Sequence, residues 1–171
     1  MRRTPVARLP AIAAVGFLLA CSPALNWREV RLDRLTAMLP CKPDHAQRTV
    51  PMAGRDVAME MVGCEAAGAL FAISHVHTDD AAHAAAVLQE WRTANLKNMQ
   101  ANDVAELATT NARGRKPAVL LNASGTGTNG GPLQARLAWW VDGADLFHMA
   151  VYAEHLTPDM TDAFFSEPKL Q

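Results

Sequence analysis

The chain of 171 residues carries 16 Lys and Arg against 17 Asp and Glu, a formal net charge of −1 at pH 7, and half of its residues are hydrophobic. The absence of a basic excess argues against nucleic acid as a partner. The length is sufficient for a single domain with a sizeable core.

The N-terminal segment has the pattern of an export signal. Arg2, Arg3 and Arg8 precede ten uncharged, mostly apolar residues, AIAAVGFLLA. This stretch is about half of the roughly 20 residues that a membrane-spanning helix needs. With the next residue it reads LLAC, which resembles the lipobox of bacterial lipoproteins, whose cysteine is acylated and becomes the mature N-terminus. We therefore predict a signal peptide over residues 1–20 and lipidation, including palmitate, at Cys21.

Lipidation of Cys21 would attach the protein to a membrane. In lipoproteins of this kind, a residue other than Asp after the cysteine usually implies sorting to the outer membrane, and here that residue is Ser22. We expect an outer-membrane protein that faces the periplasm, or a soluble periplasmic protein if Cys21 is not acylated. Residues 21–28 would be the tether and residues 29–171 one domain. Removing residues 1–20 removes three of 16 basic and none of 17 acidic side chains, which leaves a net charge of −4.

The two remaining cysteines are predicted to form a disulfide. Cys41 and Cys64 are an even pair in a compartment that is oxidising, where disulfides persist. The alternative of metal ligands lacks the close C-x-x-C spacing of such sites. The chain-entropy model assigns the disulfide about 3.4 kcal/mol of stabilisation.

Alternating hydrophobicity predicts strands in the first half of the domain. Five strands are expected, over residues 27–32, 35–39, 48–52, 57–64 and 70–77. Gly54 lies between the third and the fourth, which favours a hairpin.

The pattern changes after the fifth strand, and residues 79–100 are predicted to be a helix. Its buried stripe would contain Ala84, Leu88, Trp91 and Ala94. Thr78 or Asp79 is the expected N-cap, and Asp80 would add favourable negative charge in the first turn.

The second half is predicted to contain further strands and a short helix. The strands are expected over residues 105–112, 118–124 and 133–141, with a last strand containing Phe147, Met149 and Val151 after a turn at Asp142-Gly143. Thr157-Pro158 would start the helix. This order lacks the regular alternation of parallel α/β folds. The predicted fold class is therefore α+β, an antiparallel sheet with a long central helix and a short C-terminal helix packed on it.

Five short segments along the domain carry a resemblance to a known family. They are LPCKP at 39–43, ALFAIS at 69–74, the strands at 133–141 and 146–152, and DAFF at 162–165. Together they resemble a group of small secreted proteobacterial proteins with the PsbP-like fold, an antiparallel sheet sandwiched by helices. The resemblance covers residues 29–171, and its motifs are not catalytic. It implies a non-enzymatic accessory or binding domain.

The segment ISHVHTDDAAH at 73–83 resembles a metal site. His75, His77 and Asp79 match the H-x-H-x-D core of the metallo-β-lactamase superfamily, in which imidazoles and carboxylates converge on zinc. Against this, Asp80 stands where that family has a histidine, the chain is short, and no later ligand motif follows. The favoured interpretation is a strand entering a helix cap, with no metal ligands. The alternative is a metal-dependent hydrolase that uses His75, His77 and Asp79.

Residues 125–130, GTGTNG, form a literal G-x-G-x-x-G after a strand. Dinucleotide binding requires these glycines to open a helix whose amides hold the pyrophosphate. Here Gly131-Pro132 and an alternating strand follow instead. We predict a hairpin loop and no cofactor.

The remaining candidate surface lies on the last hairpin. Its residues, taken to alternate out of phase with Leu133 to Val141, are Arg136, Ala138, Trp140, His148 and Tyr152. One interpretation is that a helix covers this face. The other is a groove for a small molecule or a protein that uses Trp140 and Arg136.

No catalytic nucleophile can be named, because neither Ser74 nor Ser124 lies in a G-x-S-x-G motif and Cys41 and Cys64 are expected to be paired. The sequence therefore predicts a membrane-anchored, non-catalytic binding or accessory module. Its partner would be an envelope protein or a small-molecule ligand.

Overall fold

The computed structural model describes residues 24–108, 117–166 and 168–171, and in these residues the chain is mostly β. Strands hold 53 % of the described residues and helices 19 %. The elements are β1 (Arg28–Leu32), β2 (Leu35–Leu39), β3 (Asp44–Met52), β4 (Arg55–Ala66), β5 (Ala69–His77), α1 (Ala81–Asn98), β6 (Asp103–Glu106), β7 (Val119–Thr126), β8 (Pro132–Asp142), β9 (Asp145–Ala153), α2 (Pro158–Ser166) and β10 (Lys169–Leu170).

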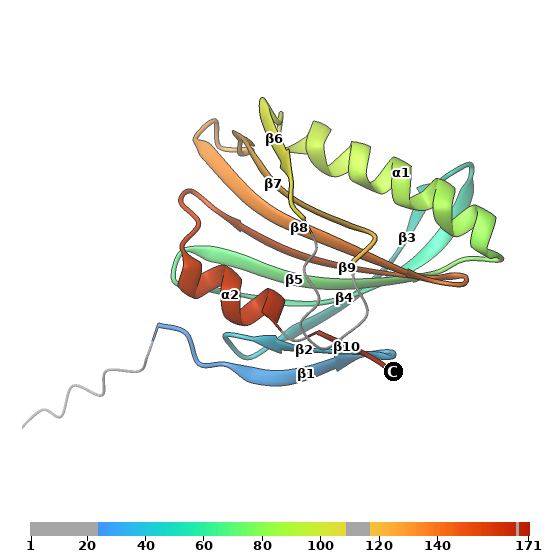
Figure 1. Ribbon diagram of the computed structural model, residues 1–171, viewed down its shortest axis with the longest axis horizontal. Helices are drawn as coiled ribbons and strands as arrows, with labels where there is room; N and C mark the ends of the chain where they lie inside the picture. Colours follow the sequence, from blue (N-terminus) through green and yellow to red (C-terminus); the bar gives the residue numbers. More distant parts are fainter. Residues whose placement is uncertain (1–23, 109–116, 167) are drawn as a thin grey trace, which may run out of the picture.

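Seven strands form the main sheet, in the order β3-β4-β5-β9-β8-β7-β6. Every neighbouring pair is antiparallel. Tight hairpins join β3 to β4 and β4 to β5, whereas α1 carries the chain from β5 in the middle of the sheet to β6 at its edge (Figure 1).

A second, three-stranded sheet has the order β1-β2-β10. The β1–β2 hairpin turns at Asp33, whose φ is +50°. Leu170 of β10 pairs with Leu35 of β2, and the Gln171 amide donates to the Arg34 carbonyl oxygen at 3.1 Å. This small sheet and α2 lie on one face of the main sheet, and α1 lies on the other (Figure 1).

The predicted α+β fold class, a PsbP-like sheet between a long central helix and a short C-terminal helix, is wrong for this chain. The described residues form two antiparallel sheets of seven and three strands with two short helices. The prediction failed because the apolar side chains of the first hairpin do not extend the main sheet. Leu35, Ala37 and Leu39 alternate with half-buried residues along β2, so they give the small sheet one apolar face that covers the main sheet.

Helix α1 begins after Asp80, the observed N-cap. The Asp80 side chain accepts a hydrogen bond from the His83 backbone N–H at 2.8 Å, and this bond lowers the pKa of Asp80. The cap is therefore one or two residues later than predicted. The buried stripe of the helix is His83, Ala84, Val87, Leu88 and Trp91. It packs on one face of the main sheet in a cluster with Leu121, Leu137 and Trp139.

The second core cluster lies between the main sheet and the small sheet with α2. Phe71 and Phe147 of the main sheet and Phe164 of α2 are at most 1 % exposed there. Trp140 joins this cluster, while Trp139 belongs to the α1 cluster. The two adjacent tryptophans thus enter opposite faces of β8, as strand alternation requires.

The last hairpin differs from the prediction in which residues share a face. Trp139 pairs with His148, and Trp140 pairs with Phe147. In a hairpin with a two-residue loop, an odd-numbered residue faces an even-numbered one, so the parity of the buried positions changes across the turn. His148 and Tyr152 therefore lie on the α1 face with Trp139, and the assignment of both to the face of Trp140 was wrong.

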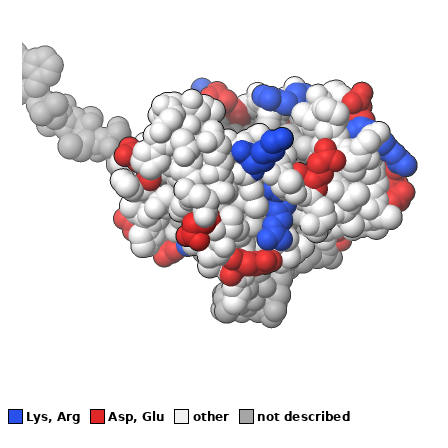
Figure 2. Space-filling model, turned by 90° about the horizontal axis from the view of Figure 1, so that it is seen from above, with Lys and Arg blue, Asp and Glu red and all other residues white. Residues whose placement is uncertain are grey.

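Most of the other predicted strands are present, with different ends. The five early strands correspond to β1 to β5, and β3 begins four residues earlier than expected, at Asp44. The strand predicted over residues 105–112 is instead the four-residue β6 from Asp103 to Glu106, and residues 109–112 lie outside the described residues. On the face seen from above in Figure 2, acidic and basic side chains are interspersed among uncharged ones.

Candidate functional site

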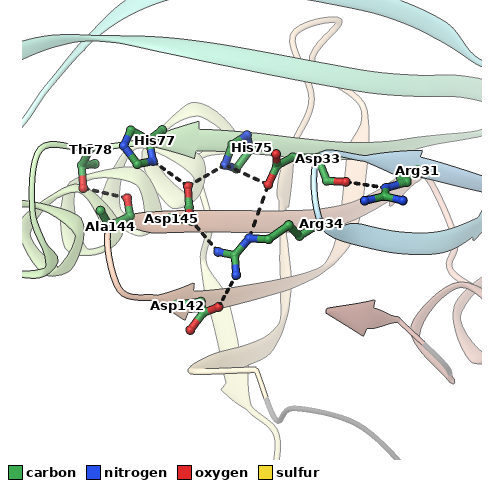
Figure 3. Close-up of polar contacts among 9 residues, drawn as sticks. All are labelled: Arg31, Asp33, Arg34, His75, His77, Thr78, Asp142, Ala144 and Asp145. Atoms are coloured by element: carbon green, nitrogen blue, oxygen red, sulfur yellow. Dashed lines mark hydrogen bonds and ion pairs between the residues drawn. The ribbon is translucent and has the colours of Figure 1, made fainter. Parts of the chain in front are cut away.

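Two histidines at the end of β5 meet a single carboxylate. His75 Nε2 lies 3.0 Å and His77 Nδ1 2.7 Å from the same oxygen, Oδ1 of Asp145. Asp145 is the first residue of β9, and β5 and β9 are paired there, with His77 opposite Asp145. Figure 3 shows both rings directed at this carboxylate. The alternation of β5 thus places positions 75 and 77 on one side, as the sequence predicts.

Arg34, from the β1–β2 turn, completes this cluster. Its guanidinium contacts Asp145 Oδ2 at 2.6 Å and Asp142 Oδ2 at 2.7 Å (Figure 3). The hydrogen bond to Asp142, together with that to Asp145, raises the pKa of Arg34. We call Arg34, His75, His77, Asp142 and Asp145 the polar network.

The charge of Asp145 is held by its neighbours. Burial alone would raise the pKa of this carboxyl group, but hydrogen bonds from His77, His75 and Arg34 outweigh it and lower the pKa. His75 also stacks on Phe147, with ring centroids 4.6 Å apart. The network therefore connects the turn of the small sheet to the main sheet through groups that satisfy one another.

Asp79 does not join the two histidines. Its carboxylate pairs with Arg55, at the start of β4, and its side chain is 70 % exposed. The neighbouring Thr78 hydroxyl donates to the carbonyl oxygens of Ala144 and Asp80. Within the described residues, no group of three or more His, Cys, Asp or Glu side chains could hold a metal ion. The structure brings together His75 and His77 of the H-x-H-x-D motif, but not its aspartate.

The groove around Trp140 and Arg136, one of the two interpretations of this face, is divided. Trp140 is 3 % exposed and belongs to the core, so it cannot line an open surface. Arg136 lines a cleft of about 500 Å³ between α2 and the strands β6 to β8. Its Nε donates to Asn122 Oδ1 at 2.9 Å, and Asp162 of α2 lies 3.9 Å from its terminal nitrogen.

A cleft lies at the opposite end of the main sheet from the polar network. It has a volume of about 970 Å³. Four segments line it: the β4–β5 turn at residues 65–70, the C-terminal end of α1, the β7–β8 loop with the start of β8 at 127–133, and the end of β9 at 152–154. We call this space the end cleft.

The floor of the end cleft is formed by neighbouring strands. Glu65, Leu70 and Tyr152 are consecutive partners across β4, β5 and β9. Leu70 is one of two large hydrophobic side chains exposed in the described residues, at 42 %. Burial raises the pKa of Tyr152 to about 12, so its hydroxyl is a neutral donor and acceptor at any physiological pH. The floor thus combines an apolar surface with a carboxylate at its edge.

The wall of the end cleft is formed by the last turns of α1. Asn95 Nδ2 lies 3.5 Å from Nε2 of His148, which is buried beneath the helix between Trp91 and Trp139. Burial lowers the pKa of His148 to about 3. The C-cap of the helix is Met99, whose carbonyl oxygen accepts from the Thr126 amide at 2.7 Å. A side chain at Gly125 would collide with this oxygen, so glycine is required where β7 meets the helix end.

The G-x-G-x-x-G segment forms the remaining wall. Thr126 pairs with Pro132, and the Gly127 amide donates to the Gly131 carbonyl oxygen at 2.9 Å, which confirms the predicted hairpin loop. Its part in a cleft was missed. Without a structure, the only available signal was the concentration of Asn, Thr and Gly in this loop, which is also typical of any exposed turn.

The predicted disulfide is confirmed. Cys41 and Cys64 are bonded, with their Cα atoms 5.9 Å apart, and they connect the segment after β2 to the end of β4. Cys21, the predicted lipidation site, lies outside the described residues. Among the helices of the described residues, none has the length and apolar character needed to cross a membrane.

A scan against protein-family models and a search of the curated proteins both found no match.

Proposed function

We propose that this chain is an exported lipoprotein, anchored through Cys21, and that its folded part is a non-catalytic binding module with the end cleft as its ligand site. The observation that carries the proposal is the end cleft itself, whose volume of about 970 Å³ is within the range of small-molecule sites. Its apolar floor and its few polar groups at the rim match the composition of such sites.

The environment proposed for the protein rests on two features. The first is the signal-like segment over residues 1–20 that ends at Cys21. The second is the disulfide, since such bonds persist in oxidising compartments. With Ser22 after the cysteine, we propose the outer membrane, facing the periplasm, as the location, and the soluble periplasm if Cys21 is not acylated.

The position of the first described residue bears on the orientation. Ala24 follows Cys21 by three positions, and three extended residues span at most about 10 Å. Trp27 contacts Phe71 near the Cys41–Cys64 bond, and the Asn26 amide donates to the Pro40 carbonyl oxygen. The blue start of the described chain lies at the same end of the molecule as the β4–β5 turn (Figure 1). An acylated Cys21 would therefore hold the end cleft near the membrane surface.

The ligand site is tested by native mass spectrometry of the full chain, extracted from membranes in a mild detergent. We expect the wild type to carry a bound small molecule and Thr128→Trp to lose it, because Thr128 is exposed in the loop that lines the end cleft. Thr49→Trp is the matched control, since Thr49 is exposed on β3 at the far edge of the sheet. A wild type without any bound molecule, or equal retention in Thr128→Trp, would contradict the proposal.

The anchor is tested separately by growing cells with a fatty acid that carries an alkyne label. We expect label on the wild type, none on Cys21→Ser, and loss of the variant from the outer-membrane fraction. An unlabelled wild type would remove the anchor and leave the soluble periplasmic form.

A further inference from the structure

The charged groups around the end cleft are of one sign. Glu65 lies at the edge of its floor and Glu154 at the end of β9, and both residues are exposed. Among the described residues that line the cleft, none is Lys, Arg or His. An anionic ligand would meet two carboxylates there, and the nearest basic side chain with a contact to either is His155, outside the lining, whose Nε2 lies 3.8 Å from Glu154 Oε1.

The end of α1 adds to this negative character. Asn98 and Met99 line the cleft at the C-terminus of the helix, where the backbone dipoles place partial negative charge. The one basic residue of the last turn, Lys97, is not part of the lining. Because the carbonyl oxygens of Asn95, Leu96, Lys97 and Met99 already accept backbone N–H groups, the helix end would stabilise a positively charged group in the cleft less than the carboxylates do.

Asn95 offers a hydrogen-bond acceptor on the wall of α1. The amide nitrogen of Asn95 faces the His148 ring, so the amide oxygen is the atom of this side chain that can accept from a ligand. Together with the carboxylates of Glu65 and Glu154, it favours a ligand that is rich in N–H donors.

The floor requires an apolar part in the same ligand. Leu70 is 42 % exposed, and Leu133, which is half-buried on β8, belongs to the same lining. Methylene groups in contact with these side chains would leave water favourably. A compact metal cation would use the carboxylates but not this surface.

We propose that the end cleft binds the ammonium groups of an aliphatic amine, with Glu65 and Glu154 pairing with the cations and Leu70 contacting the methylene chain. This proposal rests on the proposed role of the end cleft as the ligand site. The ammonium group could belong to a free polyamine or to the headgroup of a membrane lipid.

The test is isothermal titration calorimetry of the full chain in a mild detergent with four probes. Spermidine is the free amine, and dihexanoyl phosphatidylethanolamine is the amine headgroup on a lipid. Dihexanoyl phosphatidylglycerol is the matched lipid without an amine, and myo-inositol is a neutral polyol. We expect binding of at least one amine, and the tighter of the two identifies the source.

Glu65→Gln and Glu154→Gln should each weaken amine binding by about tenfold, because a charge-assisted hydrogen bond is lost without a change of shape. Glu60→Gln is the matched control on the same strand: Glu60 is exposed on β4 but is not part of the cleft lining, so binding should be unchanged. Binding should also weaken as salt is raised.

Two results would overturn the amine proposal. One is binding of phosphatidylglycerol or inositol while both amines fail, and the other is amine binding that is unchanged in both glutamine variants. If mass spectrometry still finds a ligand whose retention depends on position 128, the proposed binding function stands and only its ligand class is wrong. If neither experiment finds a ligand, both proposals are wrong.

Discussion

The two ends of the main sheet use polar residues in opposite ways. At the end where β5 finishes, the charged groups of the polar network pair with one another. The carboxylate of Asp145 contacts three of these side chains, those of His75, His77 and Arg34. At the other end, Glu65 and three asparagines surround a space of about 970 Å³. The first end is closed by its own side chains, and the second is open.

This difference separates residues that resemble a site from residues that line one. A histidine–aspartate cluster in a sequence suggests chemistry, but here the histidines and Asp145 hydrogen-bond one another across β5 and β9, and Arg34 connects Asp145 to the small sheet. Asparagine, threonine and glycine in a loop suggest only a turn, yet they border a cleft of about 970 Å³. The available space, rather than the residue types, distinguishes the two ends.

The largest expected effect is on the pH dependence of stability, and it comes from His148, which lies between the two ends of the main sheet. Its pKa is lowered to about 3 in the fold, against about 6.5 in the unfolded chain, so the unfolded chain binds more protons between these values. The contribution of the neutral ring to the free energy of unfolding is fully present above pH 6.5. It decreases as the pH drops toward 3, with a slope approaching about 1.4 kcal/mol per pH unit.

His148→Phe should flatten this slope, because phenylalanine can occupy the same place between Trp91 and Trp139 without titrating. Urea unfolding from pH 3 to 7 measures it. His45→Phe, at an exposed position of β3, is the control and should keep the wild-type slope. If His148→Phe also keeps it, burial of the neutral imidazole does not set the acid limit.

The next largest effect concerns the cleft end. Replacing both Cys41 and Cys64 with Ala should lower the free energy of unfolding by about 3 kcal/mol, because the cross-link restricts the unfolded chain. Cys64 is adjacent to Glu65, so amide exchange should accelerate at the β4–β5 turn more than at the polar network. Equal acceleration at both ends would show that the bond stabilises the fold as a whole and not the cleft end in particular.

Gly125→Ala should lower stability at the cleft end of the sheet, where β7 contacts the C-terminal end of α1. The added methyl group would collide with the Met99 carbonyl oxygen, and overpacking of this kind costs about 1–3 kcal/mol. Gly131→Ala is the control, since its nearest atom is Asn129 Oδ1 at 3.3 Å, at the end of a side chain that can move. Thermal unfolding compares the two variants, and equal melting temperatures would argue against a close approach at Gly125.

The smallest of these effects is expected at the polar network. Asp145→Asn should lower stability at neutral pH by about 1–2 kcal/mol, because charge-assisted hydrogen bonds are lost at a partly exposed site. The pKa of Asp145 is lowered in the fold, so its contribution is present above the unfolded value of about 3.9 and is lost as the pH falls through the folded value.

The asparagine variant should therefore differ from the wild type at pH 7 and approach it in acid. Urea midpoints at pH 3 and pH 7 measure this, with Glu29→Gln, exposed on β1, as the control. A difference between wild type and Asp145→Asn that grows in acid would contradict a stabilising role for the ionised carboxylate.

The sequence predicted local structure better than it predicted how the elements pack. The strand predicted over residues 57–64 is part of β4, and along it Val57 and Met59 belong to one core cluster and Val62 to the other, as the local alternation of a strand requires. The α+β class failed because nothing local reveals that Leu35 pairs with Leu170 in a separate sheet. That pairing depends on contacts between distant segments.

In the candidate site, too, local features were predictable and contacts between distant segments were not. The shared face of His75 and His77 was predictable from their spacing, but their partner Asp145 comes from β9, 68 positions after His77. The end cleft was not predictable, since it is assembled from four segments whose individual sequences have no distinctive chemistry. The disulfide was predictable because only two cysteines remained to pair.

The pairing of β10 with β2 also has a consequence for the order of folding. Thr36 and Lys169 are partners although 133 positions separate them, so the small sheet is one of the most non-local parts of the molecule. Contacts of this separation slow folding, because the intervening chain must be ordered before they form. A chain that lacks residues 169–170 would leave one edge of β2 unpaired. We therefore expect the small sheet to be completed late in folding, after nearly all of the described chain has become available to fold.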